Sequence, residues 1–281
     1  MVQKIGVVGA GQMGRGITQS LAMSGIPVII NDINNLAVDN AVNFISEQLE
    51  KGISKGKWDS AFKDKVMGLI SKSTEVRDLR DCDVVIEAAT ENKNIKFEIF
   101  KTLDEVVNQE CILASNTSSI SITEIASATK RPSKVVGMHF MNPVPIMKLV
   151  EGIKGLETSN ETFEVIRGLI KQMDKVLVES RDMPGFVVNR ILMPMINEAV
   201  YALYEGLASV EDIDEAMKLG TNQPMGPLTL ADFIGLDTCL SIMEVLHEGF
   251  GDSKYRPCPL LKQYVLSGRF GRKVKRGFYD Y

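Results

Sequence analysis

His139 is one of only two histidines in the 281-residue sequence, and its surroundings indicate acid–base chemistry. The apolar run Val135–Met138 leads into it like a buried strand, and Met147–Val150 predicts a second short strand that ends at Glu151. A carboxylate that holds the tautomer of an imidazole is the arrangement that a general base needs. A histidine at a strand end is also common as a structural residue, so the elements around it must decide between the two interpretations.

A dinucleotide-binding motif stands at the start of the chain. The apolar run Ile5–Val8 predicts a buried parallel strand, and it is followed by Gly9-Ala10-Gly11-Gln12-Met13-Gly14 and then by a helical pattern. Gly9 permits the tight turn, Gly11 lets the backbone approach a pyrophosphate, and Gly14 allows the helix to pack on the strand. The N–H groups at the start of the helix then face the phosphates. A purely structural glycine turn is the alternative.

The residue that completes this motif is Asp32. It ends the second apolar strand, Val28–Asp32, about 20 residues after the glycines, where an acid accepts hydrogen bonds from the adenosine ribose. The next residues, Ile33-Asn34-Asn35, include no arginine that would bind a 2′-phosphate. The sequence therefore favours NAD over NADP.

Between residues 36 and 70 the pattern is helical. Two amphipathic segments, Leu36–Glu50 and Ser60–Ile70, lie on either side of the lysine-rich stretch Lys51–Lys57. A parallel crossover needs only one helix, so this pair is predicted to be an inserted helical hairpin. Its lysines are either a solvated tip or a cationic contact for a phosphorylated ligand.

Polar residues follow the next predicted strands. Asp83–Ala88 leads to Glu91, and Ile112–Ser115 leads to the loop Asn116–Ser119. Ligands of open α/β sheets bind beyond the carboxyl ends of the strands. We therefore expect Glu91, this loop and His139 to face the cofactor together, which favours a functional His139.

The rest of the chain is predicted to be helical. A helix (Glu161–Met173) and a strand (Lys175–Glu179) complete the first domain, and Asp182–Gly185 has the composition of a linker. The apolar Phe186–Glu205 helix suits a core or a subunit interface, and its Asn189 would be costly to bury unpaired. Further helices are predicted at Val210–Leu219, Leu228–Phe250 and Leu260–Ser267.

Composition excludes several classes of protein. A net charge of −4 argues against nucleic acid as a main partner, and no apolar run is long enough to span a membrane. The four cysteines form no CxxC pair, so no zinc or redox motif is recognised and we predict no metal site. The first strand starts too early for a signal peptide to precede it, which predicts a cytoplasmic protein.

These patterns together predict an α/β fold. Residues 1–183 would form a Rossmann-type NAD-binding domain, with a doubly wound, mainly parallel sheet and the inserted hairpin at about 36–70. Residues 184–281 would form an all-α C-terminal domain for substrate binding and dimerisation.

Over essentially its whole length the chain resembles the 3-hydroxyacyl-CoA dehydrogenase family, in particular its stand-alone bacterial 3-hydroxybutyryl-CoA dehydrogenases. The motifs that carry the resemblance are the glycine turn, Asp83–Glu91, Ser115–Ser119, His139–Pro143, Pro184–Arg190, Pro227-Leu228 and Gly277–Tyr279.

The resemblance implies a role for individual residues. His139 and Glu151 correspond to the catalytic pair, and Ser118 and Asn189 to the residues that contact the substrate. The family's nicotinamide-site and other cofactor contacts fall on Glu91, Lys96, Ser118, Asn142 and Lys273, and its coenzyme A contact falls on Lys55. The family usually dimerises through its helical domain, which implies a homodimer.

The implied reaction is NAD-dependent oxidation of a 3-hydroxyacyl-CoA, or the reverse reduction. His139 would take the hydroxyl proton, Glu151 would orient it, and Ser118 and Asn189 would hydrogen-bond the oxygen on which charge develops. A dehydrogenase of the 6-phosphogluconate type is disfavoured because Asn189-Arg190 replaces its lysine. Two alternatives stay open: an L-gulonate-type dehydrogenase of a free hydroxy acid, and a non-catalytic NAD-sensing module.

Overall fold

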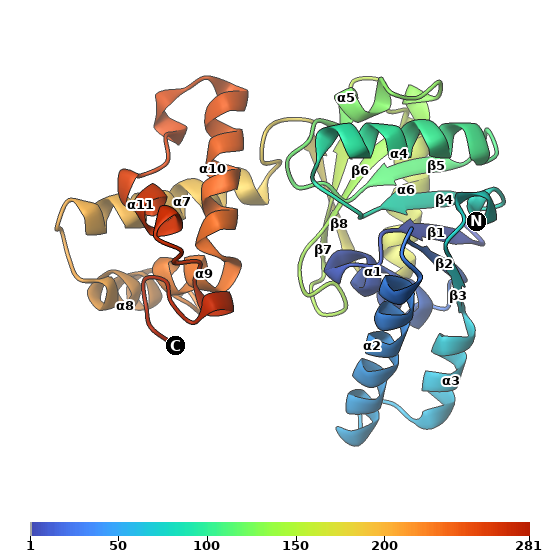
Figure 1. Cartoon of the computed structure of the whole chain (residues 1–281), viewed down its shortest axis with the longest axis horizontal. Coiled ribbons are helices and arrows are strands. Elements are labelled where there is room, and N and C mark those ends of the chain that lie inside the picture. Colours follow the sequence, from blue (N-terminus) through green and yellow to red (C-terminus); the bar gives the residue numbers. More distant parts are fainter. Residues whose placement is uncertain (1) are drawn as a thin grey trace. The chain divides into compact units, whose positions relative to one another are not determined.

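The computed structural model describes residues 2–281, which form two compact units (Figure 1). One unit ends at Met183, and the other runs from Pro184 to Tyr281. The first unit consists of β1 (Ile5–Val8), α1 (Gln12–Met23), β2 (Val28–Asn31), α2 (Asn35–Ser54), α3 (Ser60–Gly68), β3 (Ile70–Ser73), β4 (Val84–Glu87), α4 (Lys93–Val106), β5 (Ile112–Ser115), α5 (Ile122–Ala126), β6 (Val135–Phe140), β7 (Leu149–Lys154), α6 (Asn160–Gln172) and β8 (Val176–Arg181).

An eight-stranded sheet forms the centre of the first unit, in the order β3-β2-β1-β4-β5-β6-β7-β8. Every neighbouring pair is parallel except β6 and β7, which are antiparallel. The chain leaves β1 in one direction to β2 and β3 and returns to add β4 on the other side. The gap beyond the carboxyl ends of β1 and β4 is therefore the switch point at which such sheets bind dinucleotides. This confirms the predicted α/β fold class.

The helical hairpin stands off the sheet as predicted (Figure 1). Asn34 caps α2 and Asp59 caps α3 by accepting hydrogen bonds from backbone N–H groups. The indole N–H of Trp58 donates to the Leu49 carbonyl at 2.8 Å and holds the connection between the helices against α2. Helix α2 continues to Ser54, so the lysine-rich stretch is mostly helix and only its last residues form the turn.

The second unit is helical, with α7 (Val188–Tyr204), α8 (Val210–Thr221), α9 (Pro227–Ile234), α10 (Leu236–Phe250) and α11 (Pro259–Leu266). The predicted long helix Leu228–Phe250 is wrong in one respect, because it is two helices. Gly235 has a φ of 107°, which a right-handed helix cannot contain, and it ends α9 and starts α10.

None of the helices within residues 2–281 combines the length and apolar content that a membrane crossing requires. All four cysteines are buried and free. The first unit is built on apolar strands that are buried from end to end, such as β1, β4 and β5. Polar groups gather where those strands end, which is where the candidate site lies.

Candidate active site

The glycine turn between β1 and α1 has the shape that a pyrophosphate needs. A Cβ on Gly14 would collide with the Gly9 carbonyl oxygen. Gly9 has a φ of 103°, and a Cβ on it would lie only 2.6 Å from the Ala88 carbonyl oxygen. Around Gly11, by contrast, the space is open. Gly11 is the N-cap of α1, and within residues 2–281 no side chain caps this helix. The first turn of α1 also carries no acidic residue. The N–H groups there can bind an anion.

Asp32 lies beside this turn. One carboxylate oxygen accepts a hydrogen bond from the Ala10 N–H at 2.9 Å, and the other accepts from the Asn34 N–H at 3.0 Å. A carboxylate has about four acceptor positions, so two such bonds leave it able to accept from ribose hydroxyls. These residues fit the adenosine half of NAD.

Asn142 is held over the start of α1. The Gln12 side-chain amide donates to its Oδ1 at 3.1 Å, which joins two predicted cofactor residues that are 130 positions apart in the sequence. This contact brings the segment after β6 to the glycine turn.

Glu91 and Ser118 come from the loops that follow β4 and β5. One Glu91 carboxylate oxygen accepts from the Ser118 backbone N–H at 2.7 Å and from its hydroxyl at 3.0 Å. The other oxygen accepts from the Thr117 hydroxyl at 2.7 Å. Neighbouring parallel strands bring these loops to one edge of the sheet, as expected from the sequence.

His139 and Glu151 lie directly opposite one another in the antiparallel pair β6–β7. The distance from His139 Nδ1 to Glu151 Oε2 is 2.7 Å, with His139 8% and Glu151 0% exposed. Both residues lie inside their strands rather than at strand ends, and β7 begins at Leu149, two residues later than predicted. Directly opposite residues of an antiparallel pair share a face, which explains the contact.

The His139 strand is also joined to the Ser118 loop. The Asn116 side-chain carbonyl accepts a hydrogen bond from the Phe140 backbone N–H at 2.9 Å. Asn116 is 8% exposed, and it connects the end of β5 to β6 one residue beyond the histidine. The His139–Glu151 pair and the serine loop therefore belong to one polar cluster.

Lys96 is buried beneath this cluster rather than at its surface. Its ammonium forms an ion pair with Glu87 and lies 3.3 Å from the Ser115 hydroxyl, and the lysine is 1% exposed. Glu87, which the sequence analysis did not single out, is the last residue of β4 and is 0% exposed. A charged residue within an apolar strand pattern was the signal that could have identified it.

Asp182 is a second residue that the sequence analysis treated only as linker. Its carboxylate accepts from the Ser121 hydroxyl at 2.7 Å and from the Thr123 backbone N–H at 2.8 Å. It therefore holds the start of α5, which immediately follows the Ser118 loop.

The remaining predicted residues belong to the second unit and to the helical hairpin. Asn189 is in the first turn of α7 and is 8% exposed. Lys273 is in a short 3-10 turn and forms an ion pair with Asp237, with its Nζ 2.6 Å from Oδ1. Lys55 ends α2 and is exposed.

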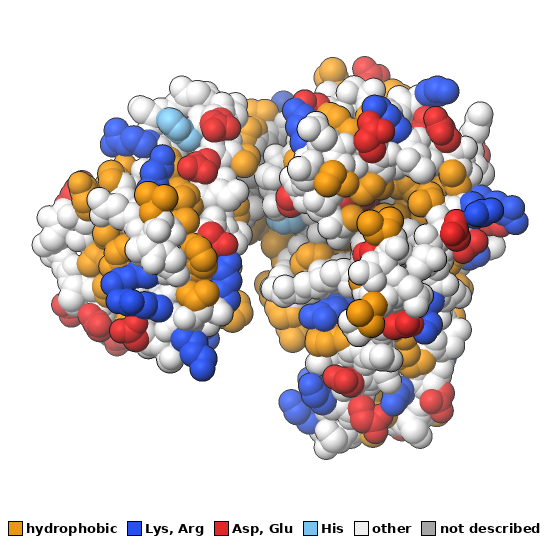
Figure 2. All heavy atoms as spheres, viewed as in Figure 1, with side chains coloured by type: hydrophobic (Ala, Val, Ile, Leu, Met, Phe, Trp, Pro, Cys, Tyr) orange, Lys and Arg blue, Asp and Glu red, His pale blue; other side chains and the backbone are white. Residues whose placement is uncertain are grey.

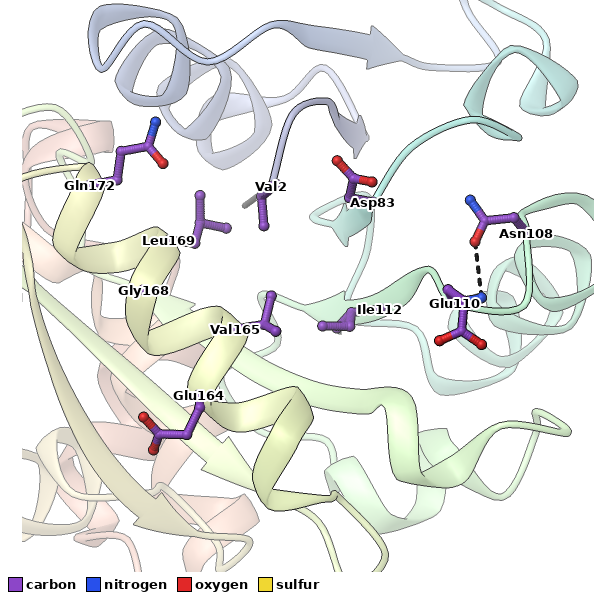
Figure 3. A pocket seen from close by; sticks show the side chains of 10 residues that line it. All are labelled: Val2, Asp83, Asn108, Glu110, Ile112, Glu164, Val165, Gly168, Leu169 and Gln172. Carbon is purple, nitrogen blue, oxygen red and sulfur yellow. Dashed lines mark hydrogen bonds between the residues drawn. The ribbon is translucent and has the colours of Figure 1, made fainter.

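A cavity of about 520 Å³ lies at the opposite edge of the sheet, where the strands begin. Figure 3 shows Val165 of α6 and Ile112 of β5 facing one another across it, with Asp83 and Glu110 nearby. None of the predicted site residues lines it. In the part of the chain that the structure describes, no group of three His, Cys, Asp or Glu side chains could hold a metal ion.

The comparisons with known proteins cover the whole chain. The family model "3-hydroxyacyl-CoA dehydrogenase, NAD binding domain" matches residues 4–183, and "3-hydroxyacyl-CoA dehydrogenase, C-terminal domain" matches residues 185–281. The chain is 56% identical over 280 residues to a probable 3-hydroxybutyryl-CoA dehydrogenase of Bacillus subtilis, covering 100% of this chain and 98% of that one.

Two further relatives agree with this similarity. A 3-hydroxybutyryl-CoA dehydrogenase of Bradyrhizobium diazoefficiens is 53% identical over 281 residues, which is 100% of this chain and 96% of that one. The crystal structure of an (S)-3-hydroxybutyryl-CoA dehydrogenase from Ralstonia eutropha superposes with a TM-score of 0.98 at 50% identity, covering 100% of this chain and 99% of that one. The resemblance seen in the motifs is confirmed, and neither open alternative is favoured. The chain belongs to the 3-hydroxyacyl-CoA dehydrogenase family, and its first domain is of the family's NAD-binding type.

Proposed function

We propose that this protein interconverts an (S)-3-hydroxyacyl-CoA, in particular 3-hydroxybutyryl-CoA, and the corresponding 3-ketoacyl-CoA with NAD. The observation that carries the proposal is the 2.7 Å contact between His139 Nδ1 and Glu151 Oε2 at the cofactor edge of the sheet. The names of the relatives support the substrate class.

The His139–Glu151 pair is suited to moving the hydroxyl proton. A ring N–H on Nδ1 that donates to Glu151 puts the basic lone pair of the neutral imidazole on Nε2, which can take a proton from a substrate hydroxyl. Glu151 then stabilises the imidazolium across the same contact. In the reducing direction the imidazolium returns the proton to the developing alkoxide. NAD, when bound, supplies the acceptor or donor for the hydride.

Ser118 and Asn189 are proposed to hydrogen-bond the substrate oxygen. In the structure the Ser118 hydroxyl donates to Glu91 at 3.0 Å, so it has to exchange that bond before it can donate to a substrate. A ribose hydroxyl that donates to Glu91 in its place would permit the exchange. Asn189 carries two amide N–H donors and is assigned this role from the family motif.

The proposed cofactor residues are Gly9, Gly11, Gln12, Met13, Gly14, Asp32, Glu91, Lys96, Ser118, Asn142 and Lys273. Gln12, Asn142, Asp32, Glu91 and Ser118 are supported by the hydrogen bonds described above. Residues 1–183 form the proposed NAD-binding domain and 184–281 the proposed substrate and dimerisation domain, in agreement with the two family models.

Lys55 is proposed to contact the phosphates of coenzyme A. Figure 2 shows basic and acidic side chains mixed over the α2–α3 hairpin, and Lys63 is already paired with Glu50 at 2.6 Å. Lys55 is exposed at the end of α2 and, among the described residues, forms no ion pair, so it is a better candidate than Lys63. A Lys55→Ala variant should raise the KM for acetoacetyl-CoA and leave kcat nearly unchanged.

A homodimer through the helical domain is also proposed. Ile191, Leu207, Leu219 and Leu266 are 67%, 79%, 77% and 87% exposed, and Figure 2 shows hydrophobic side chains on the visible face of this domain. Large exposed apolar residues mark interaction surfaces when they gather. Light scattering on the purified protein tests the dimer. Free, buried cysteines support a reducing, cytoplasmic location.

The activity is tested by following NADH oxidation with acetoacetyl-CoA and with acetoacetate, and in parallel NAD reduction with gulonate. Turnover confined to acetoacetyl-CoA is the expected result. Turnover of the free acids alone would instead assign the L-gulonate type of reaction, and NADH binding without any turnover would assign a sensing role.

A further inference from the structure

The Glu87–Lys96 ion pair takes no part in the proton transfer proposed above, and burying its two charges is costly. The side chains of Glu87 and Lys96 are 0% and 1% exposed, so both charges are removed from water. Such a pair seldom adds net stability compared with apolar residues of the same volume. Its presence at the end of β4 therefore calls for another explanation.

One oxygen of Glu87 holds the loop that carries Glu91. Its Oε1 accepts hydrogen bonds from the backbone N–H groups of Ala89 at 2.9 Å and of Thr90 at 3.4 Å. This is the same segment that packs against the glycine turn, because a Cβ on Gly9 would lie 2.6 Å from the Ala88 carbonyl oxygen and the Ala89 Cα.

The other oxygen holds the loop that carries Ser118. Glu87 Oε2 accepts from the Ser115 hydroxyl at 2.9 Å, and the Ser115 oxygen in turn accepts from the Thr117 backbone N–H at 3.2 Å. The Lys96 ammonium bridges the same two residues, with its Nζ 3.3 Å from the Ser115 hydroxyl oxygen. A single buried carboxylate is thus linked to both loops of the candidate nicotinamide site, to one directly and to the other through Ser115.

We propose that Glu87 is a positioning residue, which with Lys96 sets the 88–91 and 116–119 loops in place before NAD binds. At 0% exposure Glu87 acts through these loops and not by touching the cofactor. The significance of the loops for turnover rests on the proposed function. The arrangement of the loops in the cofactor-free protein does not depend on the proposed function, so it can be measured separately.

The test compares Glu87→Gln with the wild-type protein in two measurements, amide hydrogen exchange without cofactor and the Kd for NADH. The amide keeps the volume but loses the charge, and it cannot accept bonds on both sides as the carboxylate does. Amide hydrogen exchange of segments 88–91 and 116–119 should become faster. The Kd for NADH should rise by about tenfold or more, as expected when a site is misplaced by about an ångström.

Asp104→Asn is a matched control. Asp104 lies on α4, as Lys96 does, and pairs with Arg131 at 2.6 Å, with side chains 6% and 11% exposed, but it bonds to neither loop. This variant also breaks a buried ion pair. Its Kd for NADH should stay within about twofold of wild type, and loop exchange should not change.

The double variant Glu87→Gln/Lys96→Met buries no uncompensated charge and provides the exchange measurement if Glu87→Gln folds poorly. Fast exchange of both loops in a stably folded double variant would support the positioning role; NADH affinity is not compared in this variant, because Lys96 is itself a proposed cofactor residue. Wild-type exchange in both loops, or an equal loss of NADH affinity in Asp104→Asn, would overturn it. Wild-type protein that fails to reduce acetoacetyl-CoA would refute the proposed function and leave this comparison intact.

Discussion

Buried carboxylates occur in both units of the molecule, but they hold different groups. In the first unit the buried Glu151 contacts the His139 ring, and the exposed Glu91 accepts a hydrogen bond from the Ser118 hydroxyl. In the helical unit Asp214 accepts from the backbone N–H groups of Leu228 at 2.7 Å and Thr229 at 2.9 Å. A buried acid by itself does not mark a site. The chemistry of the group that it holds distinguishes the candidate active site from a structural cluster.

Two buried acids of the helical unit hold the motif Gly277–Tyr279 near the end of the chain. Asp232, 1% exposed, accepts from the backbone N–H groups of Phe278 at 2.9 Å and Tyr279 at 3.0 Å, and a Cβ on Gly277 would collide with its carboxylate. The Tyr279 hydroxyl donates to Asp214 at 2.9 Å, and burial together with this acid raises the pKa of Tyr279. These bonds attach the chain end to α8 and α9.

The largest effect should follow replacement of the histidine in the candidate active site. His139→Gln removes the proton acceptor while keeping a polar side chain, so kcat with acetoacetyl-CoA should fall by about 10²–10⁴-fold. Thermal unfolding should change little. His247→Gln on α10 changes the only other histidine and should keep wild-type rates. Similar rates for the two variants would remove His139 from the mechanism.

Ser118→Ala tests the second reactive group held by a carboxylate. Loss of one hydrogen-bond donor to a developing oxyanion costs about 10²–10³ in kcat, and we expect a loss in this range. The neighbouring Ser119→Ala variant is the control, because the Ser119 hydroxyl forms no hydrogen bond to Glu91 in the structure's described residues. A decrease in NADH affinity with kcat unchanged would instead assign Ser118 to cofactor binding alone.

The contrast between the two units also shows what the sequence could reveal. The glycine turn, Asp32 and the gathering of Glu91, Ser118 and His139 at one edge follow from rules about parallel strands, and the sequence predicts that arrangement. The antiparallel β6–β7 register was not predicted, so the reason for the His139–Glu151 contact came from the structure.

Two other features escaped prediction for physical reasons. Glu87 ends an apolar strand, and its partner Lys96 is nine residues away on a helix, a spacing that no local pattern relates to contact. The break at Gly235 was missed because apolar residues continue on both sides of it, as Ile234 and Leu236, and resemble one uninterrupted helix. In each case the decisive contact or dihedral angle depends on the tertiary structure.

Asp214→Asn tests the structural side of the comparison. The amide cannot accept all the bonds that the carboxylate accepts, so buried donors lose their partners, and the free energy of unfolding should fall by about 1–3 kcal/mol. Activity per folded molecule should stay near wild type. Glu215→Gln, next in sequence with its side chain 55% exposed, should change stability by less than about 0.5 kcal/mol. Urea unfolding measures the stability of both variants. A large loss of kcat in Asp214→Asn would show that this acid is not purely structural.

The smallest expected effect concerns two buried thiols, one in each unit, that donate only to backbone carbonyls among the described residues. Burial raises the pKa of Cys111 in the first unit and of Cys239 in the second to about 12, from an ordinary value of 9.0. The unfolded chain therefore ionises first as pH rises. Each thiol's contribution is complete below about pH 8.5 and is lost as pH approaches the folded-state pKa.

At pH 9.5 each thiol should already cost about 1 kcal/mol of unfolding free energy relative to pH 7. Cys111→Ala and Cys239→Ala should each reduce this pH dependence by a similar amount, measured as the difference in urea midpoint between the two pH values. Equal reductions in the two variants would show that burial alone raises the pKa of these thiols, whichever unit they belong to. A wild-type slope in either variant would mean that its thiol reaches solvent in the folded protein.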